Sequence, residues 1–428
     1  MDSINGKIIS SASSVRPLRV AVIGGSIGGL AAATAFIRLG ASVDIFEKSE
    51  TSFAARGSSL GFCAVDMWQT LTGRRMIRRG KQASRAQGAF LYGDLWAYLA
   101  EGIPDGVIRY GQNITDLGDD TMHPIVNGEP FDLAIVADGT WSVLRKRHFT
   151  PDLPLYAGWQ AWRLRVPLDL VPGWDSEGEY NTKNYSTILM RIAKNDGTDW
   201  IMGGTSIACP ESDITQPEEG TNRHAGGMEL ETPGTPAWFL DFFRSEYGHI
   251  DGGELCRAME AAAKFGKITP NPQYEFAAKQ VVKGRIVLVG DAAHTAVPRT
   301  AAGAHTAVLD GLGLFEAFRT FLTTTPAGGA GATTDAWTAA VEKGLAAYDA
   351  PAVKRARELY NRSLEVTKPV LPPGWSSEAA RIPMTPERAA TLTVVQLKAE
   401  LMARRISFAG LKEKAEFVAA LLGAVPAK

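Results

Sequence analysis

The glycine-rich stretch VAVIGGSIGGLAAATAFIRLG, residues 20–40, limits what this chain can fold into more than any other segment. It begins with an apolar run that is typical of a buried parallel strand. Glycines follow at once, and the alanine-rich segment after them predicts a helix that ends at Gly40. A second strand-like run, residues 43–46, leads to Glu47. Strand, glycine turn, helix and strand together predict a βαβ unit.

The glycines of this unit fit the dinucleotide-binding fingerprint with one departure. Gly24 and Gly29 occupy its first and third glycine positions, whereas Ser26 stands at the second. Glu47 follows Gly24 by 23 residues, where a carboxylate can bind a ribose hydroxyl. The free N–H groups at the start of the helix can bind a phosphate. The residues that we expect to contact the nucleotide are Gly24, Gly25, Ser26, Gly28, Gly29, Glu47 and Lys48.

The stretch has two other interpretations besides a nucleotide site. A membrane helix is disfavoured, because the glycines crowd one end and the charged Arg38 and Glu47 flank the second strand. A tight strand–helix turn that binds nothing stays open, because a single glycine pattern is weak evidence by itself.

The composition indicates a large globular protein of balanced charge. The chain has 428 residues and a net charge of −1, so it can bury two domains or one fused pair, and no global charge favours nucleic acid or an acidic membrane. Three cysteines lie far apart, which fits a reducing compartment and gives no metal-ligand spacing. No stretch is apolar enough for a membrane span or a signal peptide, so we expect a cytoplasmic protein without a metal site.

Two further segments each join an apolar strand to an Asp-containing turn. The first, FDLAIVADGTWSVLR (residues 131–145), runs into Asp138 and Gly139. The second, GRIVLVGDAAHTAVPRTAAGAHTAVLDG (residues 284–311), runs into Gly290 and Asp291 and continues into a glycine- and alanine-rich loop. Either segment alone has an ordinary explanation, because strands often end in such turns.

In this order and at these separations, the three motifs resemble the single-component FAD-dependent aromatic monooxygenases of the p-hydroxybenzoate hydroxylase superfamily. The resemblance covers about residues 18–365 and is greatest to the 2,6-dihydroxypyridine hydroxylases, which share the GGSIGG variant, YAGWQAWR (residues 156–163) and the Ala301-Ala302-Gly303 loop. It implies an α/β fold, in which a Rossmann-like (GR2-type) FAD-binding domain is interleaved with a β-sheet substrate domain. It also implies FAD as cofactor and NADPH or NADH as co-substrate. O2 would hydroxylate an electron-rich phenolic or heteroaromatic compound through a flavin C4a-hydroperoxide.

The resemblance also assigns roles to single residues. Asp138 and Asp291 would belong to the FAD site, with Asp291 on the ribityl or ribose hydroxyls, and Arg56 would approach the FAD at the mouth of the site. The loop formed by Pro298, Ala302, Gly303 and Ala304 would face the isoalloxazine ring. A general base that ionises the substrate hydroxyl would be His305 or Tyr156, whereas His294 is expected to support the loop structurally.

Three departures from the family pattern leave a second interpretation open. The region after Gly61 is short, Ala301 replaces the first glycine of the loop, and Tyr92 begins a YGD segment where an arginine is usual. An inactive or non-catalytic flavoprotein is therefore an alternative.

The expected organisation is discontinuous along the chain. Residues 18–155 and 284–366 would form the FAD-binding part, and residues 156–283 the substrate part. Residues 367–386 contain five prolines and predict a linker.

Residues 387–428 predict a helical hairpin that resembles a SAP motif. Such modules commonly bind DNA, which gives a third alternative, a nucleic-acid-associated protein. Seven Lys or Arg against four Glu is a mild basic excess, however, so we favour a hairpin for docking or for contact within a homodimer.

Overall fold

A computed structural model describes residues 17–54, 59–61, 65–74, 89–193, 197–214, 235–266, 268–322 and 334–424. Its first sheet has the strand order β14-β15-β8-β1-β2-β5. These strands are β1 (Arg19–Ile23), β2 (Ser42–Phe46), β5 (Ile108–Arg109), β8 (Leu133–Val136), β14 (Val282–Lys283) and β15 (Ile286–Leu288). Strands β15, β8, β1, β2 and β5 are parallel, so their carboxyl ends meet along one edge.

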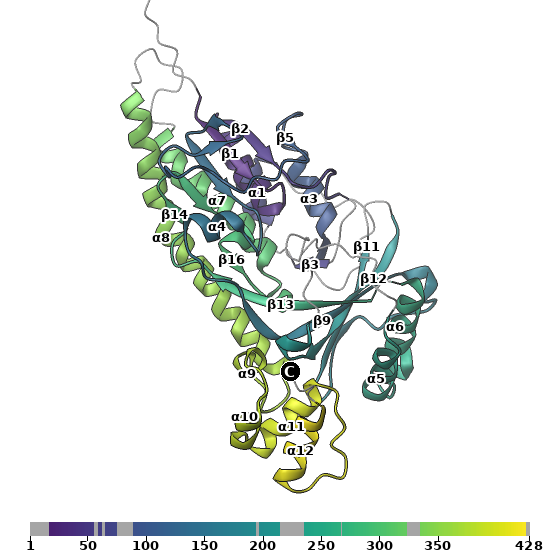
Figure 1. Cartoon of the computed structure of the whole chain (residues 1–428). Helices are drawn as coiled ribbons and strands as arrows, with labels where there is room; N and C mark the ends of the chain where they lie inside the picture. The colour runs from purple at the N-terminus through teal and green to yellow at the C-terminus, as the bar shows by residue number, and fades with distance from the viewer. Residues whose placement is uncertain are drawn as a thin grey trace, which may run out of the picture.

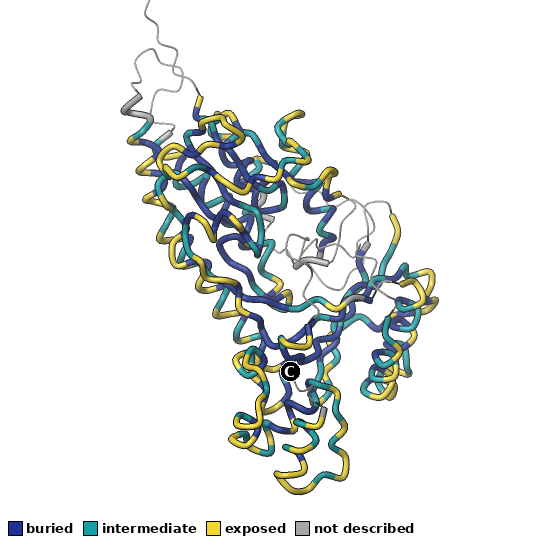
Figure 2. Tube along the Cα trace, in the orientation of Figure 1, coloured by how far each residue is buried: buried dark blue, intermediate teal, exposed yellow. Residues whose placement is uncertain are grey.

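The first sheet is buried because helices cover it. Helix α1 (Ile27–Arg38) connects β1 to β2, which confirms the predicted βαβ unit. Helix α7 (Gly303–Leu322) lies against α1 so closely that a Cβ at Gly311 would be 2.6 Å from the Ala31 carbonyl carbon. Figure 2 shows the buried residues running through these strands and helices, with exposed residues on their outer side.

The second sheet is antiparallel and has the order β10-β11-β12-β9-β13-β16. Its strands are β9 (Leu155–Pro167), β10 (Gly178–Asn181), β11 (Ser186–Ala193), β12 (Asp199–Ala208), β13 (Thr269–Ala277) and β16 (His294–Thr295). Because β16 follows β15 after one short turn, the third sequence motif links the two sheets (Figure 1).

The two faces of the second sheet have different coverings. Helices α5 (Ala237–Tyr247) and α6 (Glu254–Phe265) pack on the outer face, where Trp162 and Leu164 of β9 join their core. The inner face is turned to the first part of the molecule, because Met202 and Ile192 pack against Leu91. The chain thus leaves the first sheet after β8 and returns to it at β14, which confirms the interleaved α/β fold.

Shorter elements complete the two layers. The minor strands are β3 (Ser59–Gly61), β4 (Ala89–Leu91), β6 (Ile125–Val126) and β7 (Glu129–Pro130). The remaining helices are α2 (Val65–Thr72), α3 (Tyr92–Ala100), α4 (Val143–His148), α8 (Thr334–Thr367), α9 (Ser377–Arg381), α10 (Pro386–Thr391), α11 (Val394–Ala403) and α12 (Lys414–Ala424). Helix α8 runs along both layers toward the C-terminal helices (Figure 1). In the described part of the chain, no helix is both long and apolar enough to cross a membrane.

The segment 367–386, which the prolines indicate to be a linker, is instead packed on β9. Trp375 is buried, and its Nε1 donates a hydrogen bond to the Gly158 carbonyl at 2.9 Å. Ser377 Oγ donates to the Ala157 carbonyl at 2.7 Å, and Arg381 donates to the Tyr156 carbonyl at 2.9 Å. The prolines shape turns here, and the apolar side chains between them anchor the segment.

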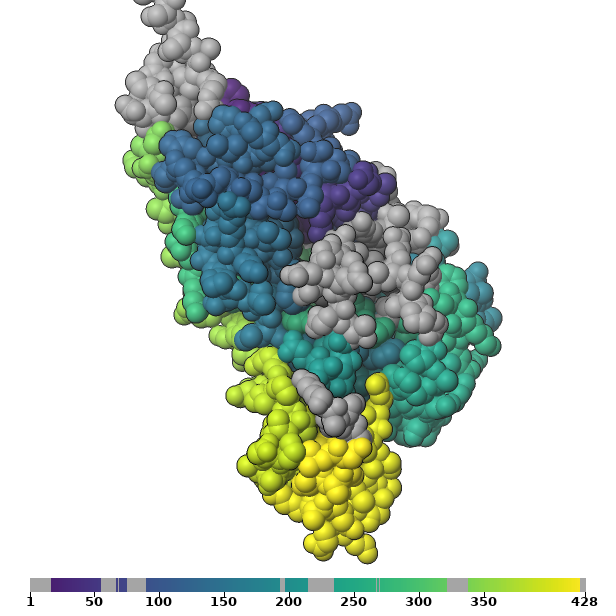
Figure 3. Space-filling model, in the orientation of Figure 1, coloured from purple at the N-terminus to yellow at the C-terminus, as the bar shows by residue number. Residues whose placement is uncertain are grey.

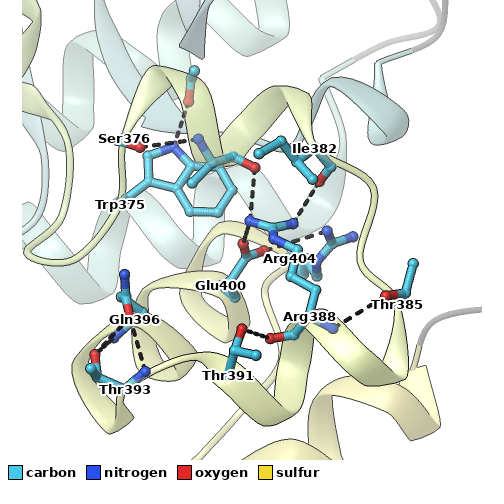
Figure 4. A network of polar contacts seen from close by, with 12 residues as sticks. Trp375, Ser376, Ile382, Thr385, Arg388, Thr391, Thr393, Gln396, Glu400 and Arg404 are labelled. Carbon is cyan, nitrogen blue, oxygen red and sulfur yellow. Dashed lines mark hydrogen bonds and ion pairs between the residues drawn. The ribbon is translucent and has the colours of Figure 1, made fainter.

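The C-terminal helices form a lobe at the lower end of the molecule (Figure 3). The buried carboxylate of Glu400 accepts hydrogen bonds from Arg388 at 2.6 Å and from Arg404 at 3.4 Å. Figure 4 shows this network beside Trp375. Arg404 also pairs with Asp213 at 3.4 Å, and Arg405 lies over the ring of Trp238 at 4.1 Å from its centroid. The basic residues of the hairpin turn therefore contact the protein itself.

Candidate functional site

The turn after β1 is built from two glycines that leave no room for a side chain. Gly24 has φ +107°, and a Cβ there would be 2.3 Å from the Ala137 carbonyl oxygen at the end of β8. A Cβ at Gly29 would be 1.9 Å from the Gly24 carbonyl oxygen. The turn is thus pressed against both its own helix and the neighbouring strand. This places the N-terminus of α1 at the carboxyl edge of the sheet, where it can receive an anion.

Glu47 ends β2 beside this turn, as the fingerprint predicts. Its carboxylate is buried and accepts hydrogen bonds from the Gly25 N–H at 2.7 Å and the Ser49 N–H at 2.8 Å. The carboxylate is therefore fixed next to the glycine turn, with lone pairs left to accept a further hydroxyl. Lys48 is exposed, and Arg56 lies outside the described residues.

Helix α3 closes the other side of the turn. The Tyr92 hydroxyl lies 2.6 Å from Ser26 Oγ, and Trp96 Nε1 donates to the Gly25 carbonyl at 2.7 Å. Ser26, at the second glycine position of the fingerprint, is thus hydrogen-bonded to Tyr92, which stands where the family usually has an arginine. These two departures from the family pattern therefore contact each other.

The second and third motifs meet the first at the same edge. A Cβ at Gly28 would be 3.3 Å from Gly290 Cα, so α1 lies directly against the turn after β15. Thr140 Oγ1 donates to Asp291 Oδ2 at 3.3 Å. The buried Arg145 donates to the Ala292 carbonyl at 2.9 Å and to the Thr140 carbonyl at 2.7 Å. Three segments that are distant in sequence therefore form one continuous edge.

Two carboxylates on this edge are held in surroundings that disfavour their charge. Burial raises the pKa of Asp138, whose Oδ1 is buried without a hydrogen-bond partner. Burial also raises the pKa of Asp291, although solvent still reaches this side chain. Burial lowers the pKa of Arg145 to about 10 while the two carboxylates oppose that shift. The unsatisfied oxygen of Asp138 fits a ligand that brings a hydroxyl donor.

His294 supports the edge from behind, as expected for a structural residue. Its Nε2 lies 2.7 Å from Asp310 Oδ2, and both side chains are buried. Asp310 also accepts from the Gly290 N–H at 2.9 Å and from Arg355 at 3.0 Å. Burial disfavours both charges, but their mutual attraction raises the pKa of His294 and lowers that of Asp310. The network fixes the third turn from helices α7 and α8.

The loop between β16 and α7 joins the edge to the second sheet. Pro298 begins it on the surface, and Ala301 adopts the left-handed conformation with φ +50°. Ala302, Gly303 and Ala304 are half-buried and lead into the first turn of α7. Arg299 donates to Ser186 Oγ at 3.0 Å and to Glu179 at 2.6 Å, which anchors the loop to the inner face of the sheet.

The two candidate bases occupy different places. His305 is half-buried in the first turn of α7, and burial, with a smaller contribution from Arg362, lowers its pKa. Tyr156 lies elsewhere, so its expected role as a base is corrected. Its hydroxyl donates to the Cys209 carbonyl at 3.0 Å within a cluster that contains Trp375 and Ala399 of the C-terminal helices. Burial raises the pKa of Tyr156 well above its usual value, so the phenol stays protonated.

Comparison with known proteins agrees with this geometry. A family model described as an FAD binding domain matches residues 252–332. The 6-hydroxynicotinate 3-monooxygenase of Pseudomonas fluorescens is 25% identical over 337 residues, which cover 68% of this chain and 80% of that protein. The chain is therefore similar to FAD-dependent aromatic monooxygenases.

Solved structures of such flavoproteins share the fold. The 2,6-dihydroxypyridine-3-hydroxylase from Arthrobacter nicotinovorans superposes with a TM-score of 0.61 at 18% identity, covering 84% of this chain and 93% of that one. HpxO of Klebsiella pneumoniae, in complex with FAD and uric acid, superposes with a TM-score of 0.55 at 18% identity, covering 95% and 97%.

The residues of this flavin monooxygenase fit FAD on structural grounds. The cradle at Gly24 and Gly29 would be filled by any Cβ, and Asp138 offers a buried oxygen without a partner.

Several residues that build the edge were not predicted from the sequence. Arg145 follows the DG turn directly, so its place was open to prediction, whereas Tyr92, Trp96 and Asp310 gave no signal because their partners lie far away in sequence.

Proposed function

We propose that this flavin monooxygenase hydroxylates an electron-rich phenolic or heteroaromatic compound, with NADPH or NADH as the reductant and O2 as the oxidant. The observation that carries the proposal is the continuous edge formed by the ends of β2, β1, β8 and β15, which faces the inner side of an antiparallel sheet. An extended cofactor with a flat ring requires such a surface on one side and a substrate wall on the other.

The residues along the edge follow the order of the chemical groups of FAD. In this proposal Glu47 binds the ribose, and Gly24, Gly25, Ser26, Gly28 and Gly29 surround the pyrophosphate. Asp138 and Asp291 accept from polyol hydroxyls, and the loop of Pro298, Ala302, Gly303 and Ala304 faces the ring. The strand order places Glu47, the glycine turn, Asp138 and Asp291 in this sequence along the edge, which supports the assignment.

The bound flavin supplies the redox chemistry, and the protein controls its surroundings. The lowered pKa of His305 keeps its imidazole neutral near pH 7, as a base for a substrate hydroxyl requires. We therefore propose that His305 accepts this proton. Tyr156 is not proposed for this role, because it stays protonated in a buried cluster away from the edge. The free, buried Cys209 and Cys256 are consistent with a cytoplasmic location.

The experiment is an absorbance scan of the purified protein followed by an assay of NADH and NADPH oxidation with a panel of hydroxypyridines and phenols. We expect flavin bands, and at least one compound should accelerate oxidation of the nicotinamide. A flavin-containing protein that no aromatic stimulates would point to the non-catalytic alternative, and a protein that cannot be loaded with FAD would contradict the proposal.

A further inference from the structure

A series of hydrogen bonds leads from a buried carboxylate to the loop between β16 and α7. Ser363, on α8, donates its hydroxyl proton to Glu275 Oε1 on β13 at 2.7 Å. The same hydroxyl oxygen accepts a hydrogen bond from the Val297 N–H at 3.0 Å. A serine hydroxyl has one proton and two lone pairs, so donation to Glu275 turns a lone pair toward Val297. The carboxylate therefore sets the orientation of the hydroxyl that holds Val297.

The series continues from the carbonyl of Val297 into the loop itself. This carbonyl accepts hydrogen bonds from Thr300 Oγ1 at 2.9 Å and from the Thr300 N–H at 3.1 Å. Thr300 Oγ1 accepts in turn from the Ala302 N–H at 3.2 Å. Helix α7 begins at the next residue, Gly303. The position of Val297 is therefore transmitted through hydrogen bonds to the first residue of that helix.

The interior part of this series is closed to water. Glu275, Ser363 and Val297 are each at most 1% exposed. Burial raises the pKa of Glu275. The hydrogen bonds from Ser363 and Thr367 and the charge of Arg381 oppose that rise. Because water cannot replace a lost partner here, removal of the Ser363 hydroxyl would leave the buried Val297 N–H unsatisfied unless the loop moves. A buried network of this kind holds the backbone that it contacts in one place.

We propose that Ser363, oriented by Glu275, is a positioning residue that holds this loop and the start of α7 beside the isoalloxazine ring. The inference rests on the proposed function, in which the loop faces that ring. The N-terminus of a helix carries partial positive charge, and reduction of a flavin adds electrons to its ring. A helix start held close to the ring therefore favours the reduced flavin and makes its midpoint potential more positive.

The test is the midpoint potential of the bound flavin, measured by redox titration of the FAD-loaded full chain in the absence of substrate. Ser363→Ala removes the hydroxyl, so the loop should move away from the ring. We expect a potential about 30 mV more negative than that of wild type. This shift corresponds to about 10-fold weaker binding of reduced flavin relative to oxidised flavin, for a two-electron couple.

Thr367→Val is the matched control for a purely structural effect. Thr367 donates to the same Glu275 oxygen at 3.4 Å, one turn along α8 from the hydroxyl that holds Val297. The control should lower the free energy of unfolding and leave the midpoint potential unchanged.

Glu275→Gln separates positioning from a direct effect of charge. Its amide oxygen can accept the bond from Ser363 without a charge, and charge-assisted hydrogen bonds are roughly twice as strong. We expect a shift in the same negative direction, about half as large as that of Ser363→Ala. Removal of a negative charge near the ring would by itself shift the potential in the positive direction, so the sign distinguishes the two effects.

The inference is overturned if Ser363→Ala has the potential of wild type, or if Thr367→Val shifts the potential equally. If Ser363→Ala does not retain flavin, Glu275→Gln decides, and a potential equal to or more positive than that of wild type overturns the inference.

Failure of the proposed function gives a different result. Equal potentials in a protein whose nicotinamide oxidation is stimulated by an aromatic would remove this inference alone. The expected shifts in a protein that no aromatic stimulates would remove the proposed function alone. A protein that cannot be loaded with FAD would contradict both.

Discussion

At the scale of single residues, the cofactor cradle depends on glycines that are crowded by backbone atoms. A Cβ at Gly24 or Gly29 would lie 2.3 Å or 1.9 Å from a carbonyl oxygen, so a valine must push the helix away from the sheet. We predict that Gly24→Val and Gly29→Val purify without flavin and bind added FAD at least about 100-fold more weakly than wild type, a loss of about 2.7 kcal/mol. Titration of FAD into the apo-proteins measures this.

Ser26→Ala is the matched control for these variants. Ser26 already carries a Cβ, and its hydroxyl bonds to Tyr92 at 2.6 Å. Its loss should cost about 0.5 to 1.5 kcal/mol, the net value of one hydrogen bond. If Gly24→Val binds FAD as tightly as Ser26→Ala, the cradle assignment is incorrect.

Ala301, in the loop between β16 and α7, has an unfavourable backbone conformation. Its φ of +50° lies in the left-handed region, which costs an L-residue about 1 to 2 kcal/mol. Ala301→Gly removes this strain but gains entropy in the unfolded chain, worth about 0.5 to 1 kcal/mol. We predict a net gain in the free energy of unfolding of about 0.5 to 1 kcal/mol, measured by urea denaturation. Ala302→Gly, at a position without positive φ, should destabilise instead, and the opposite ranking would argue against this loop conformation.

At the scale of elements, the buried pair of His294 and Asp310 connects the third turn to α7 and makes stability depend on pH. The raised pKa of His294 means that its stabilisation is complete below its usual value of 6.5 and is lost as the pH rises through the folded value. The lowered pKa of Asp310 adds stabilisation above 3.8 that is lost in acid. The free energy of unfolding should therefore decline on the alkaline side of neutrality.

His294→Gln should be less stable near pH 6 and should lose this alkaline decline, because its side chain does not titrate. Urea denaturation at about pH 6 to 9 measures both proteins. An equal alkaline decline in wild type and His294→Gln would show that another group is responsible.

The packing of the C-terminal helices differs more from the expectation drawn from the sequence than that of any other element discussed above. A proline-rich linker would allow residues 387–428 to be removed without consequence for the rest of the chain. In the structure, Ala399 and Ala403 of α11 share a buried cluster with Tyr156 and Trp375. We therefore predict that the deletion lowers the free energy of unfolding by about 1.5 to 3 kcal/mol for each large apolar side chain that it uncovers.

FAD content should survive this deletion, because the glycine turn and Asp291 lie in the other layer. Calorimetry and the flavin absorbance of the purified truncated protein measure the two properties separately. Lys412→Ala, an exposed change in the turn between α11 and α12, is the control for effects of expression and purification. A truncated protein that is as stable as the full chain would mean that the contacts around Trp375 contribute little.

The βαβ unit was predictable from sequence because its information is local. An apolar strand, a glycine turn and an alanine-rich helix follow one another within residues 18–47, and β1, α1 and β2 have nearly those bounds. The packing of residues 367–386 was not predictable in this way. Five prolines suggested a flexible connection, and the hydrogen bond from Trp375 to Gly158 joins residues 217 positions apart. Composition gives no information about such a partner.

At the scale of the whole molecule, the two sheets form two different surfaces of the candidate site. The parallel sheet carries the edge that we propose for the extended cofactor, and the inner face of the antiparallel sheet is the wall that we propose for the substrate. The three motifs could be recognised in order along the chain, which is why the fold and the cofactor were predictable. The position of Tyr156 was not predictable, because the sequence places it on a strand without showing that it packs with Trp375 and the C-terminal helices.

The most direct test of the account follows the oxygen atom. The FAD-loaded protein, NADPH or NADH, and a stimulating aromatic are incubated under isotopically heavy O2, and the product is analysed by mass spectrometry. We predict a hydroxylated product that carries one heavy oxygen atom from O2, in proportion to the nicotinamide oxidised. Oxidation of the nicotinamide that yields only hydrogen peroxide, or a product whose new oxygen comes from water, would contradict the account.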